Sequence, residues 1–268
     1  MSPQRTAAIV LRQLYLFRGS PARILPVFIW VAIDVVLWGF ITRYLNSFSS
    51  SEGYNFVPAL LGAVLLWDFF TRVMQGVTTA FFEDVWSRNF LNVFASPLWI
   101  SEYITGLVLS SIWTSTIGLT IMLILAKGFF GLSFLRYGWL LIPFFLLLFL
   151  FGIALGIFAS GVVLSMGPGA EWLIWPIPAL LSPFAAVFYP LSTLPQWMQW
   201  IGHALPPSYV FEGMRTILSG RPVPQFDFLI GAGLDVLFLA LAYWFFLRVY
   251  RDVVRTGLIA RYSAETLS

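Results

Sequence analysis

Apolar runs long enough to cross a lipid bilayer recur along this chain and leave few folds open to it. Of its 268 residues, 59% are hydrophobic and only 10% are charged, whereas soluble domains carry roughly a quarter charged residues. A water-soluble protein of this size could not bury so many Phe, Leu and Trp side chains. The sequence therefore predicts an all-α polytopic membrane protein.

Six runs have the length of a membrane span, since about 20 residues cover the hydrocarbon core. We predict a single transmembrane domain over residues 1–268, with spans at residues 24–45, 56–82, 99–126, 137–164, 172–189 and 226–250. The fourth span contains Gly152, Gly156 and Ser160, a small-residue ladder that favours close packing of helices. Prolines interrupt the fifth span, because proline removes a backbone donor and bends a helix.

Two further segments are expected to lie at the membrane surfaces. Residues 3–20 combine helical spacing of apolar residues with arginines on other faces, which predicts an interfacial helix. Residues 191–221 are rich in proline and tryptophan and too polar for a simple span, and predict two short re-entrant helices split near Pro206. Arginines flank both ends of the chain, so the positive-inside rule predicts that both termini are cytoplasmic. Residues 191–221 are then external.

Residues 82–97 are the most polar stretch between two long apolar blocks. Read as a helix, this stretch places apolar residues on one face and Asp84 and Arg88 on another, at the spacing of a helical ion pair. Pro97 ends the helix, because the residue before a proline favours an extended backbone. We expect a short amphipathic helix on the cytoplasmic side. An ordinary polar loop between spans is the alternative.

Four ionisable residues fall inside predicted spans: Asp34, Asp68, Arg72 and Asp235. Such groups are costly at membrane depth unless they face protein or water. Asp68 and Arg72 are four residues apart and can neutralise each other; alternatively, they line a polar surface between subunits. For Asp34, a hydrogen bond between helices and a contact with cargo are both open.

Several functions have no support in the sequence. The chain has no cysteine and one histidine, His203, so thiolate chemistry is excluded and a catalytic zinc site is not expected. No basic patch outside the membrane flanks suggests nucleic-acid binding. No Gly-x-x-x-x-Gly-Lys-Ser/Thr phosphate-binding motif occurs, so any ATP hydrolysis would have to reside on another chain.

Two stretches carry a family likeness. Residues 82–97 bring acidic residues after the second span and end in Ser-Pro-Leu, while residues 181–218 contain Tyr-Pro, Leu-Pro and Glu-Gly-Met-Arg elements. Together they resemble the transmembrane permease subunits of type-2 ATP-binding-cassette exporters, and the six-span plan and length extend the likeness over nearly the whole chain. The first stretch departs from the commoner Glu-Arg-Glu pattern followed by Gly-Thr, which leaves the subfamily and its substrate open.

The resemblance implies a transport subunit with no catalytic residue, metal or cofactor of its own. Two permease copies would pair with two ATPase subunits, which bind ATP and magnesium, and would export a drug, lipid or lipid-linked polysaccharide across the inner cell membrane. We lean to an amphipathic, lipid-like or lipid-linked cargo. The implied ATPase-coupling residues are Glu83, Asp84, Trp86, Arg88, Ser96 and Pro97. The implied external gate comprises Tyr189, Pro190, Pro195, Glu212 and Arg215.

Two other functions remain open from the residues alone. A membrane-embedded lipid-modifying transferase would need an acid–base pair, and the candidates Asp34, Asp68, Glu212 and His203 form no recognisable cluster in the sequence. A passive channel could use the 27 Phe, 12 Trp and 10 Tyr residues to line a path, although aromatic residues in spans more often pack against lipid and other helices.

Overall fold

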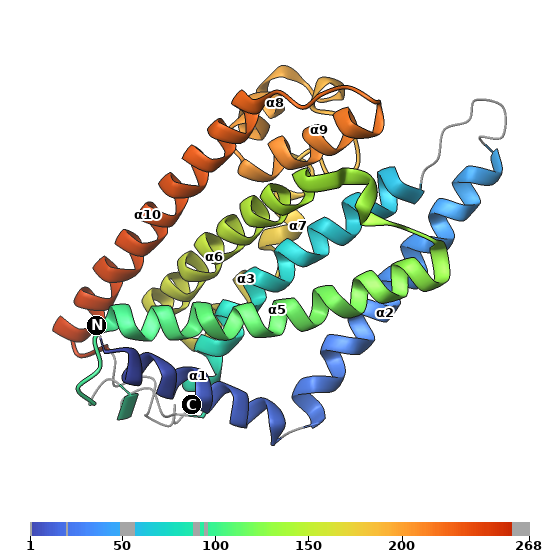
Figure 1. The fold of residues 1–268 in the computed structure, drawn as a ribbon. Helices are drawn as coiled ribbons and strands as arrows, with labels where there is room; N and C mark the ends of the chain where they lie inside the picture. The colour runs from blue at the N-terminus through green and yellow to red at the C-terminus, as the bar shows by residue number, and fades with distance from the viewer. Residues whose placement is uncertain (1, 20, 49–56, 88–91, 94–95, 259–268) are drawn as a thin grey trace.

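Helices make up most of the described chain. The computed structural model describes residues 2–19, 21–48, 57–87, 92–93 and 96–258, and no strand occurs among these residues. Within them, five helices are long and apolar enough to cross a membrane (Figure 1): α2 (Pro21–Phe48), α3 (Gly62–Trp86), α5 (Ile100–Phe130), α6 (Leu141–Met166) and α10 (Gln225–Arg255). A π-helical turn, Val57–Leu61, leads into α3, and a 3-10 segment, Phe134–Leu140, leads into α6.

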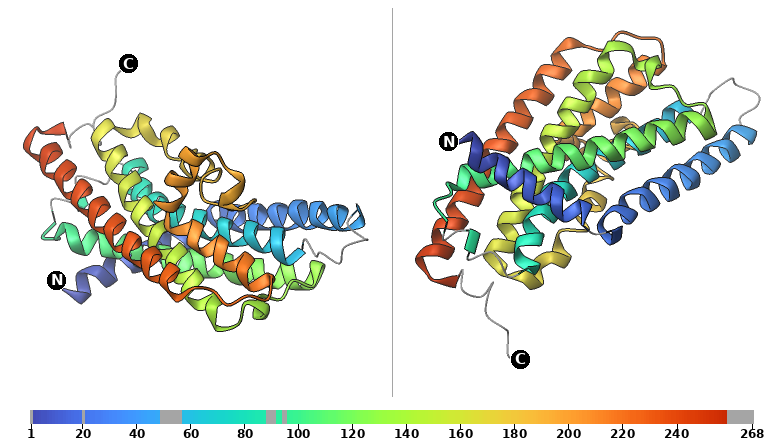
Figure 2. Two further views of the ribbon diagram at one scale, coloured as in Figure 1. Left: turned by 90° about the horizontal axis from the view of Figure 1, so that it is seen from above. Right: turned by 60° about the horizontal axis from the view of Figure 1, so that its bottom comes forward.

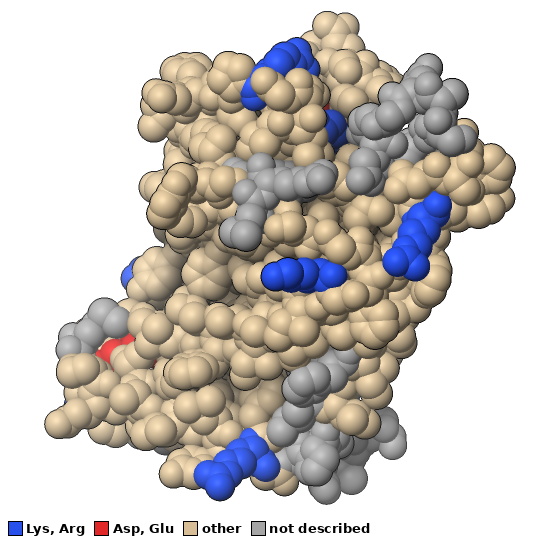
Figure 3. Space-filling view, turned by 45° about the vertical axis from the view of Figure 1, so that its right-hand side comes forward, with Lys and Arg blue, Asp and Glu red and all other residues tan. Residues whose placement is uncertain are grey.

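The long helices pack in an order that differs from their order in the chain. Helix α10 packs on α6, α6 on α3, α3 on α5, and α5 on α2, as the views of Figures 1 and 2 show. Helix α3 is central, since 72% of its most apolar window is buried, against 22% for α2 and 17% for α10. The flanking helices therefore present apolar surface outward, and Figure 3 shows a face on which isolated Lys and Arg side chains interrupt a broad uncharged surface.

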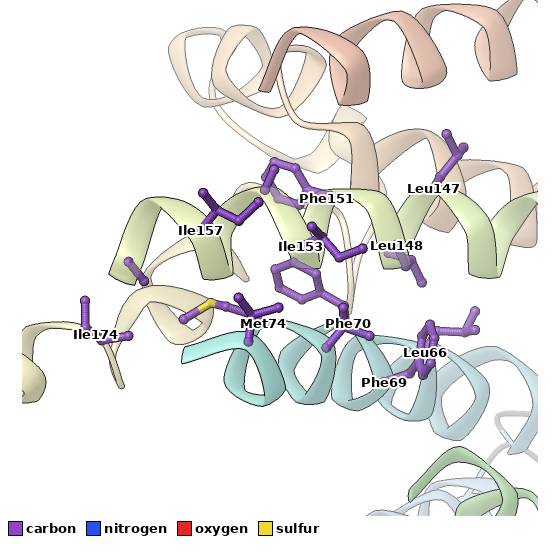
Figure 4. Close-up of a cluster of buried hydrophobic side chains, with 14 of the residues drawn as sticks. Leu66, Phe69, Phe70, Met74, Leu147, Leu148, Phe151, Ile153, Ile157 and Ile174 are labelled. Atoms are coloured by element: carbon purple, nitrogen blue, oxygen red, sulfur yellow. The ribbon is translucent and has the colours of Figure 1, made fainter. Parts of the chain in front are cut away.

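The seam between α3 and α6 forms the centre of the core (Figure 4). Phe70 and Met74 of α3 are fully buried there against Phe151 of α6, whose ring stacks on that of Phe70 at a centroid distance of 5.5 Å. The close approach depends on small residues. A Cβ added to Gly156 would lie 2.7 Å from Val77 Cβ and 3.0 Å from the Met74 carbonyl oxygen. Gly152 and Gly156 of the small-residue ladder predicted from the sequence thus lie in a close contact between α3 and α6.

The fifth predicted span is not a continuous helix. After α6 the chain forms the 3-10 segment η3 (Pro168–Leu173) and the five-residue helix α7 (Ile177–Leu181), followed by turns. This broken segment carries the chain from the end of α6 back toward α8 and α9 (Figure 1). Pro176, Pro178 and Pro183 explain the interruption, because each lacks a backbone N–H to donate.

Two short helices follow where the sequence predicts them: α8 (Gln196–His203) and α9 (Pro206–Leu218), with the 3-10 turn η4 (Leu191–Thr193) before them. They lie together at one end of the molecule, while α1 (Pro3–Arg18) and the carboxyl end of α10 lie at the other (Figure 1). We call these the α8–α9 end and the α1 end. That α8 and α9 re-enter a membrane stays a prediction.

Two helix ends differ from those predicted. Helix α3 continues through Trp86 instead of ending at residue 82, because no proline or glycine interrupts its last turns. Residues 82–86 therefore belong to the same helix as the second span, while residues 88–91 and 94–95 of the predicted 82–97 helix lie outside the described residues. Helix α5 continues past Gly128 to Phe130 and ends at Gly131, whose φ of 65° is a left-handed cap conformation that glycine adopts without strain.

Candidate functional site

A buried ion pair joins three helices at the α1 end. The Asp84 carboxylate, near the end of α3, is fully buried and accepts hydrogen bonds from the Arg12 guanidinium of α1 and from the Tyr103 hydroxyl of α5, the latter at 2.7 Å. A buried carboxylate is tolerable only when it is paired and hydrogen-bonded. Asp84 therefore ties α1 to the junction of α3 and α5.

Helix α1 is held at a second point by the amino end of α5. Glu102 Oε2 accepts the backbone N–H of Trp99 at 3.0 Å, which caps α5, while Oε1 accepts the backbone N–H of Ser2. Farther along α1, Ile9 lies so close to Gly106 that an added Cβ there would come within 2.7 Å of it. The whole amino-terminal helix thus packs along α5.

The faces of α1 are arranged in an unexpected way. Its buried residues are Thr6, Ile9 and Gln13, and Gln13 Nε2 donates to the Ala80 carbonyl of α3 at 3.1 Å. Apolar Leu11 and Leu14 are exposed. The helix is amphipathic, as predicted, but part of its polar side faces the protein because Asp84 and the end of α3 require hydrogen-bonding partners.

This geometry changes the charged face expected for residues 82–97. Glu83 and Asp84 are buried in the subunit, and Asp84 pairs with Arg12 of α1; Arg88, the partner expected from helical spacing, lies outside the described residues. Of the predicted coupling residues, Trp86, Ser96 and Pro97 are exposed. Among the described residues of this stretch, Glu83 and Asp84 are therefore not available to a partner, while Trp86, Ser96 and Pro97 are.

One hydrogen bond connects the end of α3 to the broken segment. The indole Nε1 of Trp86 donates to Glu171 Oε2 in η3 at 2.9 Å. The Trp86 ring also packs on that of Phe82, at a centroid distance of 5.6 Å. The hydrogen bond between Trp86 and Glu171 therefore links the end of α3 to the segment that precedes α7.

A polar group lies among α2, α3 and α5 within the apolar helices. Arg72 Nε donates to Asp68 Oδ2 at 2.7 Å, so the two residues form the ion pair that their spacing predicts. The Arg72 side chain extends toward Gly118 of α5, where an added Cβ would meet it at 3.1 Å. Asp34 of α2 is close enough to interact electrostatically with both members of the pair. The structure thus adds Asp34 to the Asp68–Arg72 pair that the sequence predicts.

Asp235 stands apart from that polar group. It is fully buried in α10, and neither of its carboxyl oxygens has a hydrogen-bond partner among the described residues. The structure therefore does not bring together the four intramembrane residues found in the sequence.

At the α8–α9 end, Glu212 and Arg215 of α9 fasten the segment that follows α7. Glu212 Oε1 accepts the Leu191 backbone N–H at 2.7 Å, and Arg215 Nη1 lies 3.4 Å from the same carboxylate. Arg215 Nη2 also donates to the carbonyl groups of Ala186 and Val187. These contacts hold Ala186 at a φ of 56°, which is unusual for a residue with a Cβ.

The other residues of the expected external gate lie beside these contacts. The Tyr189 hydroxyl donates to the Pro183 carbonyl at 2.9 Å, while Pro190 and Pro195 directly precede η4 and α8. In α9, the Tyr209 hydroxyl donates to the His203 carbonyl at 2.8 Å. Burial, and to a smaller degree the Asp227 carboxylate, raise the pKa of Tyr209, so this hydroxyl stays a donor at physiological pH.

The sequence pattern did not identify several of the residues that organise both ends. Arg12, Tyr103, Glu102, Glu171 and Ala186 all make contacts with residues far away in the chain. Helical spacing relates residues three or four apart, so it carries no signal for these pairs.

Comparison with known proteins agrees with this architecture. The family model described as ABC-2 type transporter matches residues 6–219, which include most of α1, the end of α3, the broken segment and both short helices. No curated protein matches the chain. Because the family model covers most of the chain, and covers both ends described above, the protein belongs to the ABC-2 type transporter family.

Proposed function

We propose that this chain is the permease subunit of an ATP-driven exporter in the inner cell membrane. Two copies of it would pair with two ATPase subunits, which bind ATP and magnesium. The observation that carries the proposal is the family match, supported by the absence of a phosphate-binding motif from the sequence. The cargo we infer is amphipathic, lipid-like or lipid-linked, because the broken segment and the tryptophan-rich α8 suit a path at the bilayer's edge.

The proposed route of coupling starts at the exposed surface of the α1 end. An ATPase would contact Trp86, Ser96 and Pro97. The buried Asp84 would act from within, because its pair with Arg12 fixes α1 to α3, and Glu83 is buried beside it. Displacement of this end would reach the broken segment through the Trp86–Glu171 hydrogen bond. At the far end, the contacts of Glu212 and Arg215 would open or close the outer exit.

The experiment is co-purification of the permease with its ATPase from membranes in which both are expressed. The double variant Ser96→Arg and Pro97→Arg adds bulk and charge to the exposed surface without touching the buried Asp84 pair. The matched control is Gln225→Arg, an exposed position at the start of α10. We expect loss of the ATPase with the double variant alone, and unchanged elution of the permease in both cases.

Retention of the ATPase by the double variant would contradict the proposed docking surface. Turnover of a lipid substrate by the purified chain alone would instead favour a membrane-embedded transferase. Ion conduction without nucleotide would favour a channel.

A further inference from the structure

An open-sided cavity of about 660 Å³ lies at the α8–α9 end, between η4, α8, α9 and the segment leading into α10. Its lining includes polar side chains from all of these parts of the chain. Those used in the argument are Ser192, Gln199, His203, Glu212, Arg221 and Asp227. A hollow with so many polar groups is suited to a hydrophilic ligand.

Two side chains of opposite charge in this lining, Arg221 and Asp227, have no partner among the described residues. Within the part of the chain that the structure describes, neither the Arg221 guanidinium nor the Asp227 carboxylate has a hydrogen bond or ion pair, and the two do not pair with each other. Glu212 differs, because the Leu191 N–H and Arg215 already hold its carboxylate. Arg221 is positioned by its backbone, whose N–H donates to the Thr216 carbonyl at 3.1 Å.

The charged side chains of the lining favour a zwitterionic ligand over an anionic or a neutral one. A guanidinium is the preferred partner of a phosphate, and a carboxylate accepts hydrogen bonds from an ammonium group. A purely anionic ligand would be repelled by Asp227 and Glu212, and a neutral sugar would leave both free charges unneutralised. A zwitterion that carries a phosphate and an ammonium satisfies Arg221 and Asp227 at once.

The surroundings indicate where such a zwitterion comes from. Helix α8 contributes Gln199 and His203 to the cavity and also carries Trp197 and Trp200, both strongly exposed. Exposed tryptophans are typical of the level of lipid head groups in a membrane. We propose that the cavity binds the phosphoethanolamine head group of a membrane phospholipid, with its phosphate on Arg221 and its ammonium on Asp227.

The test is native mass spectrometry of the full chain, released from detergent in the presence of equal amounts of phosphatidylethanolamine, phosphatidylcholine and phosphatidylglycerol. We expect phosphatidylethanolamine to be retained most, because phosphatidylcholine has no N–H to donate and phosphatidylglycerol has no ammonium. Arg221→Gln should weaken retention of phosphatidylethanolamine by about tenfold, the value of a charge-assisted hydrogen bond. Asp227→Asn should remove the preference over phosphatidylglycerol.

The matched control is Arg43→Gln. Arg43 is also an exposed arginine beside a cavity, but its guanidinium already donates to the Phe129 carbonyl at 2.8 Å and lies 5.1 Å from the centre of the Phe130 ring. This substitution removes the same charge and should leave phosphatidylethanolamine retention unchanged. Thermal unfolding of each variant checks that it is folded, and the preference of the wild-type chain among lipids tests the proposal without any substitution.

Four results would overturn the proposal. The first is equal retention of phosphatidylethanolamine by Arg221→Gln and by the wild-type chain. The second is a preference of the wild-type chain for phosphatidylglycerol. The third is stronger retention of digalactosyldiacylglycerol than of phosphatidylethanolamine, which would indicate a site for a neutral sugar. The fourth is binding of soluble O-phosphoethanolamine as tight as that of the lipid, which would refute the assignment to a membrane lipid.

Discussion

Asp84 illustrates how one buried side chain can decide the position of a whole helix. Its carboxylate has no access to solvent and depends on Arg12 of α1 and Tyr103 of α5. Arg12 is about one-third exposed, with a side-chain exposure of 32%. The two partners are therefore not equivalent: Arg12 neutralises the charge at the protein surface, while Tyr103 is fully buried with it.

Removing the Arg12 side chain should destabilise the protein more than removing the Tyr103 hydroxyl. Arg12→Ala leaves a buried carboxylate without its counter-charge and should cost about 3 kcal/mol. Tyr103→Phe removes one hydrogen bond to a charged group and should cost about 1.5 kcal/mol. Unfolding in detergent with increasing denaturant measures both values. Losses below about 0.5 kcal/mol for both variants, the range of ordinary surface substitutions, would show that Asp84 does not depend on this pairing.

At the scale of elements, the closely packed contact between α3 and α6 contrasts with the broken segment that follows α6. The glycines of α6 allow the backbones to approach closely, which makes this pair the rigid part of the fold. The segment with η3 and α7 lacks a continuous helical hydrogen-bond ladder and is the natural place for movement. Trp86 and Glu171 join the rigid part to the broken one.

Glycine substitutions should separate tight packing from helix propensity. Gly156→Ala places a methyl group against Val77 and the Met74 carbonyl and should cost about 1–3 kcal/mol through overpacking. Gly233→Ala in α10 is the control, since nothing lies within 4 Å of its added Cβ. That control should be neutral or more stable by up to about 1 kcal/mol. Equal stability of the two variants in thermal unfolding would contradict the close α3–α6 contact.

The Trp86–Glu171 hydrogen bond should affect coupling rather than folding. Trp86→Phe keeps an aromatic ring but removes the N–H donor, and we expect cargo moved per ATP hydrolysed to fall by up to about tenfold, the equivalent of one hydrogen bond. Glu171→Gln retains an acceptor oxygen and should have a smaller effect. The control is Trp99→Phe, an exposed tryptophan whose indole has no hydrogen bond within the described residues. Transport and ATPase rates measured on the same reconstituted complex give the ratio, and an unchanged ratio for Trp86→Phe would exclude this route.

At the scale of the whole molecule, the sequence predicts the membrane class and the approximate spans, because long apolar runs have few alternatives in water. The prolines of the fifth span predict its interruption, which the structure shows as η3 and the short helix α7, whereas nothing in the local sequence marks how far α3 continues beyond the second span. The candidate site is less predictable. Spacing finds the Asp68–Arg72 pair within one helix, but the partners of Asp84 come from separate helices and depend on the assembled fold.

The predicted orientation can be tested directly because the chain has no cysteine. Single variants Ser96→Cys and Ser192→Cys place one thiol at the exposed surface of each end of the molecule. In intact cells, a membrane-impermeant maleimide should label Ser192→Cys alone, and Ser96→Cys should be labelled only after the membrane is opened. The reverse pattern would invert the molecule and exclude docking of a cytoplasmic ATPase at the α1 end.

The arrangement of α1 has a consequence for the order of events during synthesis. Its Arg12 binds a residue 72 positions later in the chain, and Ser2 binds one 100 positions later. When α1 leaves the ribosome, neither partner residue has yet been synthesised, so these two contacts cannot form until α3 and α5 follow. During that interval its exposed Leu11 and Leu14 can contact lipid. The exposed apolar side of α1 would then hold the helix at the membrane before α3 and α5 are available to bind it.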